Sequence, residues 1–195
     1  MKKLVLLITI CLFYTSIFSQ TMFKVENFNY FDYGNSDNFK AVANIYAQKK
    51  ISDKISVYSF FAVNKVWGEG FLGVKYSPFK KLSLAFGAGM ESHEDLWRTN
   101  HSVFVGDDKI SLFYYGEIGS SGNWFSIEAK YRITNPTKST KLKIGVLARK
   151  YFGVGPRLDI YTKSGLYFWT CPVQYDWLSQ ESQKIVNVSA IGMKF

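Results

Sequence analysis

The chain has 195 residues, with 24 Lys and Arg against 15 Asp and Glu, so its formal charge is +9. This length suits one domain or at most two small ones, and two cysteines are too few for a disulfide scaffold. Aromatic residues make up 18% of the chain, which excludes a disordered protein and favours strands over helices.

Residues 1–19 have the pattern of a secretory signal peptide. Lys2 and Lys3 precede an apolar run from Leu4 to about Phe18, which is shorter than the roughly 20 residues of a membrane-spanning helix. Ser19 is a candidate cleavage position, and an uncleaved anchor is the alternative. We therefore expect an exported mature protein, residues 20–195. Only one cysteine remains after cleavage, so we expect no disulfide within the chain.

Beyond residue 20, apolar and polar residues alternate with a period of two, which is typical of β-strands. In residues 125–133, one face carries only apolar residues and Tyr131, while the other carries Ser126, Glu128, Lys130 and Arg132. Turn-forming residues interrupt the alternation and predict about twelve strands, with a range of 10–12. The expected strands cover residues 22–31, 38–50, 54–64, 67–77, 81–91, 96–105, 109–118, 123–134, 140–151, 156–162, 165–173 and 184–195.

The turns between these strands fall into two alternating sets. One set is short and includes residues 52–54, 77–80, 106–108, 135–137 and 163–165. Several members of the other set, such as residues 32–38 and 174–182, are longer. Short turns on one side and longer loops on the other are typical of outer-membrane barrels. We therefore predict an all-β fold: a closed antiparallel up-and-down transmembrane β-barrel that occupies residues 20–195.

The alternation does not by itself say which face of the sheet is outside. A soluble secreted barrel that binds an apolar ligand would turn its apolar face inward, whereas a membrane barrel does the reverse. Mixed charges on the polar faces suit a wet interior, and aromatic residues such as Tyr76, Trp97 and Trp124 near expected strand ends suit an interfacial girdle. These features favour the membrane barrel, and the soluble barrel stays open as an alternative.

The signal peptide, the alternating strands and a chain that ends on an aromatic residue resemble bacterial outer-membrane β-barrel proteins of the Bacteroidetes type. Phe195, Met193 and Ile191 are similar to the signal that the barrel-assembly machinery reads, although Asn187 and Ser189 stand where such signals usually carry apolar residues. The resemblance implies a monomer in the outer membrane, with outer-membrane lipid and the assembly machinery as partners. It identifies no family of known activity.

The predicted facing places more basic than acidic side chains in the lumen. If the lumen is open, rings of basic side chains favour the entry of anions, so we expect a narrow anion-favouring pore or a structural envelope protein. If the lumen is plugged, the same residues form internal salt bridges. The basic candidates are Lys75, Arg98, Lys130, Arg132, Lys143, Arg149 and Arg157, and their acidic partners are Glu91, Glu117, Glu128 and Asp159.

Other functions find less support in the sequence. A lipid- or glycan-modifying enzyme is an alternative, but His93 and His101 have only Ser92 and Ser102 beside them, and adjacent residues in a strand point to opposite faces. We therefore assign no catalytic residue. The same scarcity of His and Cys leads us to expect no metal and no cofactor. Nucleic-acid binding is not expected for an exported chain without a basic helix.

Overall fold

The computed structural model describes residues 20–30, 39–64, 67–92, 97–150, 153–175 and 184–195. The predicted signal peptide and His93 lie outside these ranges. All regular structure in them is β-strand, so the all-β prediction is confirmed. The twelve described strands are β1 (Gln20–Tyr30), β2 (Phe39–Lys50), β3 (Ile55–Val63), β4 (Gly68–Phe79), β5 (Leu82–Glu91), β6 (Trp97–Gly106), β7 (Ile110–Gly119), β8 (Gly122–Thr137), β9 (Thr140–Arg149), β10 (Gly153–Thr162), β11 (Leu166–Tyr175) and β12 (Lys184–Lys194).

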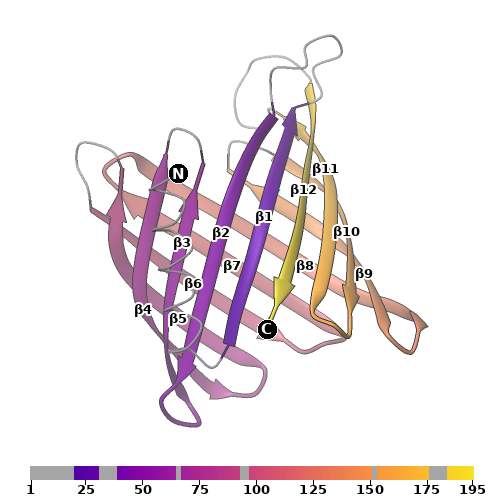
Figure 1. Ribbon diagram of the computed structural model, residues 1–195, viewed down its shortest axis with the longest axis horizontal. Helices are drawn as coiled ribbons and strands as arrows, with labels where there is room; N and C mark the ends of the chain where they lie inside the picture. The colour runs from indigo at the N-terminus through magenta and orange to yellow at the C-terminus, as the bar shows by residue number, and fades with distance from the viewer. Residues whose placement is uncertain (1–19, 31–38, 65–66, 93–96, 151–152, 176–183) are drawn as a thin grey trace, which may run out of the picture.

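The strands form an antiparallel up-and-down sheet, in which each strand pairs with its neighbours in sequence (Figure 1). β1 pairs with β2 on one side and with β12 on the other, so the first and last described strands are neighbours in the sheet. Within the described ranges, no helix is long and apolar enough to span a membrane.

The predicted short turns lie together at one end of the barrel, which we call the turn end. They connect β2–β3, β4–β5, β6–β7, β8–β9 and β10–β11, and β12 also ends there. Gly106 and Gly165 adopt φ of 130° and 88° at two of these turns, a conformation that other residues rarely accept. We call the opposite end, where Ser120 and Ser121 connect β7 to β8, the far end.

Several strand boundaries differ from the prediction, mainly at prolines. Pro78 and Pro136 were expected in turns, yet β4 and β8 continue through them to Phe79 and Thr137. The strand register shifts at both places, so the missing proline N–H interrupts a ladder that is already irregular. Pro156 was expected at a strand start, but β10 begins three residues earlier, at Gly153.

The apolar face of the sheet points outward. On β8, Ile127 is 38% and Tyr131 46% exposed, while the alternate residues Glu128 and Lys130 are half-buried inside. The same alternation exposes large apolar side chains along β4, β5, β7, β9 and β10, including Leu72, Val74, Phe86, Leu112, Ile144, Val146 and Leu158. The described part of the interior holds buried charged groups such as Arg98 and Asp159 and a packed apolar cluster, formed by Leu147, Tyr167, Trp169, Cys171, Val188 and Ala190 on β9, β11 and β12.

Candidate functional site

The interior of the barrel contains clusters of buried charged side chains, and it is therefore the candidate functional site. Near the far end, the buried Arg98 of β6 contacts three carboxylates on three neighbouring strands. Its guanidinium nitrogens lie 3.1 Å from Glu69, 3.0 Å from Glu91 and 2.8 Å from Glu117. Ser121 donates from its backbone N–H and from its hydroxyl to Glu91. One cation therefore links β4, β5, β6 and β7: it forms charge-assisted hydrogen bonds with Glu91 and Glu117 and an ion pair with Glu69.

A second layer of side chains lies closer to the turn end on the same wall. The Tyr58 hydroxyl donates to Asn100 Oδ1 at 2.6 Å, and Asn100 Nδ2 donates to the Tyr115 hydroxyl at 3.2 Å. The ring of Phe60 on β3 also meets the ring of Tyr115 on β7, with centroids 6.1 Å apart. Because β3 and β7 are not neighbours in the sheet, this contact narrows the interior.

The opposite wall is braced by a mixed charge network on β8 and β10. Arg157 forms a two-pronged pair with Asp159 and also lies 2.9 Å from Glu128, which pairs with Lys130 at 2.8 Å. The Arg157 guanidinium stacks 4.1 Å above the Trp169 ring. This network fills part of the lumen, so the interior is narrower than the strand number alone would allow.

Among the described residues, two neighbouring cavities lie between these layers. The inner cavity has a volume of about 560 Å³ and extends from Arg98 and Glu117 to Lys75, past several aromatic side chains. The turn-end cavity measures about 690 Å³ and opens among the short turns. Phe104, Phe113 and Glu128 line both cavities, so these three side chains form the boundary between them.

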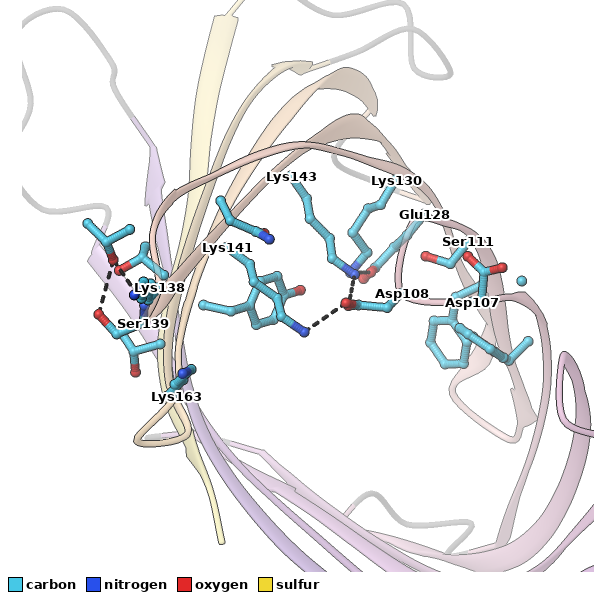
Figure 2. Close-up of a pocket in the computed structure, with 18 of the residues that line it drawn as sticks. Asp107, Asp108, Ser111, Glu128, Lys130, Lys138, Ser139, Lys141, Lys143 and Lys163 are labelled. Atoms are coloured by element: carbon cyan, nitrogen blue, oxygen red, sulfur yellow. Dashed lines mark hydrogen bonds and ion pairs between the residues drawn. The ribbon is translucent and has the colours of Figure 1, made fainter.

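The turn-end cavity is basic. It is lined by six lysines, Lys80, Lys130, Lys138, Lys141, Lys143 and Lys163, and by three carboxylates, Asp107, Asp108 and Glu128. Figure 2 shows Lys141, Lys143 and Asp108 gathered across the cavity. Asp108 lies 2.7 Å from Lys141, 3.1 Å from Lys143 and 2.7 Å from Arg132. The hydrogen bond from Lys141, together with Lys143, lowers the pKa of Asp108.

The predicted lumen residues separate into two groups. Arg98, Arg149, Arg157, Lys130 and the four acidic residues lie in the buried networks; Arg149 stacks over Trp124 and Trp169. Lys143 and Arg132 line or border the turn-end cavity, and Lys75 lies in the inner cavity beside Gln48.

Several residues outside the predicted set also belong to this interior. Phe104 and Phe113 point inward, on the polar faces of β6 and β7, so the alternation of these strands is the signal that could have found them. Asp108, Lys138 and Lys163 sit in the turns, where solvated charges are common. Trp124, which was expected in an outer aromatic girdle, faces the interior, whereas Tyr76 and Trp97 are exposed outside.

The histidine candidates do not form a catalytic arrangement in the described residues. His101 faces outward, where its Nε2 lies 3.0 Å from the Tyr114 hydroxyl, and Ser102 faces the inner cavity. No group of three or more His, Cys, Asp or Glu in the described ranges is arranged to hold a metal ion.

The fold is similar to those of solved membrane proteins. A structure described as "KdgM porin" superposes with a TM-score of 0.54 at 11% identity, covering 90% of this chain and 99% of that one. A second, described as "Unveiling the Mechanism Behind the in-meso Crystallization of Membrane Proteins", gives a TM-score of 0.57 at 7% identity, covering 90% of this chain and 84% of that one. No family model and no curated protein matches the sequence.

Proposed function

We propose that the chain is an integral outer-membrane β-barrel that forms a narrow, anion-favouring pore. The observation that carries this proposal is the inverted barrel: large apolar side chains cover the exterior, and paired charges occupy the interior. A soluble barrel has the opposite arrangement, because water must be met by polar groups and the core must be apolar. The likeness to a porin fold supports the same proposal.

The proposed solute path passes through both cavities and across the boundary at Phe104, Phe113 and Glu128. Anion preference would arise at the turn-end cavity, where lysines outnumber carboxylates by six to three. We assign Lys75, Arg132 and Lys143 to this path, together with Lys138 and Lys163. Arg98, Lys130, Arg149 and Arg157 would instead keep the lumen in shape, because carboxylates or aromatic rings already engage them.

The location follows from the same proposal. Export would remove residues 1–19, and the assembly machinery would then read the end of β12. Ile191 and Phe195 are 54% and 70% exposed on the outer face, with Met193 between them, which leaves this segment accessible to a partner. The serine–glutamine cleavage position supports the Bacteroidetes type.

Planar-bilayer recording of the purified mature chain tests the pore. We expect discrete conductance with a reversal potential that indicates anion preference. Lys138→Glu combined with Lys163→Glu should shift that potential toward cations, because the turn-end cavity would lose four units of positive charge. A matched control is Lys54→Glu combined with Lys109→Glu, which changes turn-end charge outside both cavities. Absence of conductance in folded, reconstituted protein would contradict the proposal.

A further inference from the structure

The outer face of the barrel is not uniformly apolar. Halfway along β11 and β12, the outward positions carry Thr170, Asn187 and Ser189, all half-buried. The outward residues nearer the turn end are apolar again, and Phe168 and Ile191 are 41% and 54% exposed. Ser189 is the central residue of β12, so the polar segment lies in the middle of the strand and not at its end.

The strand register extends this segment into two rows. Thr170 is paired with Ser189. In the next row toward the far end, Pro172 is paired with Asn187. Directly paired residues share a face of the sheet. We call the surface formed by Thr170, Pro172, Asn187 and Ser189 the polar seam; it lies on β11 and β12, in the front of Figure 1.

A polar seam at this depth is costly in lipid. The apolar band of an outer-membrane barrel is about 25 Å tall, so the middle of each strand faces acyl chains that offer no hydrogen bonds. Thr170 donates its hydroxyl to Asn187 Oδ1 at 2.8 Å, which satisfies one donor of the seam. The two N–H groups of the Asn187 amide take no part in that bond. A protein surface that supplies acceptors would satisfy them.

We propose that the polar seam is the interface between two copies of this chain, related by a two-fold axis along the membrane normal. The inference rests on the proposed membrane placement and replaces the monomer expected from the resemblance. Amides and hydroxyls both donate and accept, so the seam is complementary to itself, as a two-fold interface requires. On β2, the half-buried outward residue Ala43 is small and would permit a close approach of the second barrel.

Oxidative cross-linking in lipid nanodiscs tests the interface directly. Near a two-fold axis a residue meets its own copy, so Ser189→Cys should give a disulfide-linked dimer under mild oxidation. Phe86→Cys is the matched control, because Phe86 is 61% exposed in the middle of β5, far around the barrel. The native Cys171 is buried inside and should give no dimer. Equal cross-linking at residues 86 and 189 would overturn the proposal.

A second measurement separates this proposal from the membrane placement. Asn187→Leu combined with Ser189→Leu should convert the dimer to a monomer in size-exclusion chromatography with light scattering in detergent. The barrel should remain folded, as judged by heat-modifiable gel mobility, because only side chains on the outer face change. A wild-type protein that needs detergent but is monomeric in both detergent and nanodiscs would overturn the interface alone. A wild-type protein that stays soluble without detergent would overturn the membrane placement as well.

Discussion

At the scale of single residues, small side chains decide where large ones can lie. A Cβ atom at Gly73 would come within 2.4 Å of the Tyr58 ring, and one at Gly87 within 2.6 Å of the Tyr58 hydroxyl. The glycines of β4 and β5 therefore leave the space through which Tyr58 of β3 reaches Asn100 of β6. The pattern of glycine and aromatic residues thus fixes the shape of the lumen as much as the charges do.

Gly87→Val should destabilise the barrel by roughly 1–3 kcal/mol, because the added side chain must displace both Tyr58 and Asn100. Urea unfolding in lipid vesicles, followed by tryptophan fluorescence, would measure the loss. Gly68→Ala is the control, since the nearest atom to its added Cβ is an ordinary 3.6 Å away. Equal stability of the two variants would contradict the packing argument.

Arg98→Met should cost about 3–5 kcal/mol, because it leaves three buried carboxylates without their shared cation. The same urea titration would detect it. Arg98→Lys retains the charge but not the fork of donors, so we expect an intermediate stability. If Met were tolerated as well as Lys, the cluster would owe its stability to something other than this guanidinium.

At the scale of elements, the β6–β7 turn braces the basic end of the barrel. Asp107 accepts hydrogen bonds from the backbone N–H groups of Lys109 and Ile110, which shapes the turn, and pairs with Lys81 of the neighbouring hairpin. The neighbouring Asp108 forms ion pairs with Arg132 of β8 and with Lys141 and Lys143 of β9. One short turn therefore holds three hairpins in place and reduces the positive charge of the cavity.

Asp108→Asn should increase anion preference at neutral pH, because it removes one of three carboxylates that face six lysines. Its effect on stability should be small, ~1 kcal/mol or less, since the Asp108 side chain is about half exposed. The reversal potential under a salt gradient would measure the preference. Asp53→Asn is the control, because Asp53 lies in the β2–β3 turn and lines neither cavity.

The lowered pKa of Asp108 also predicts a pH dependence. A carboxyl whose folded pKa lies below its ordinary value, about 3.9, gives its full stabilisation above that value and loses it as the pH falls further. The difference in anion preference between wild type and Asp108→Asn should therefore persist from pH 7 to about pH 4 and shrink only in stronger acid. A difference that vanished near pH 6 would contradict the lowered pKa.

At the scale of the whole molecule, the inner cavity and the turn-end cavity meet at a shared boundary, which the proposed solute path would have to cross. Phe104 and Phe113 contribute rings to the boundary between the cavities, where Glu128 is held by Arg157 and Lys130. Because side chains form this boundary, substitutions at Phe104 and Phe113 should widen it without disturbing the pairing of the strands.

Phe104→Ala combined with Phe113→Ala should raise the single-channel conductance, because the two cavities would merge. The loss of two rings should leave the outer face unchanged and the heat-modifiable mobility intact. Phe86→Ala, on the outer face of β5, removes a ring of the same size without touching the path and should leave conductance unchanged. An unchanged conductance in the double variant would place the narrowest point elsewhere.

Much of the fold was predictable from the sequence because a strand alternates its faces. Ile127 and Tyr131 lie on one face of β8 and Glu128 and Lys130 on the other, whatever surrounds the strand. The turns at residues 52–54, 106–108 and 163–165 were also predictable, because Asp, Ser and Gly favour them locally. The turns expected at Pro78 and Pro136 were wrong. Proline favours turns locally, but β4 and β8 continue through these positions because the pairing there is irregular.

The partners of each charge could not be read from the sequence. Alternation turns Arg98 and Arg132 inward alike, yet Arg98 meets three buried carboxylates and Arg132 meets a turn residue at the barrel end. These contacts depend on the strand register and on the curvature of the sheet, which bring together residues that are far apart in the chain. The sequence by itself determined which side chains share a face; only the tertiary structure decided which of them touch, because that depends on pairing between strands.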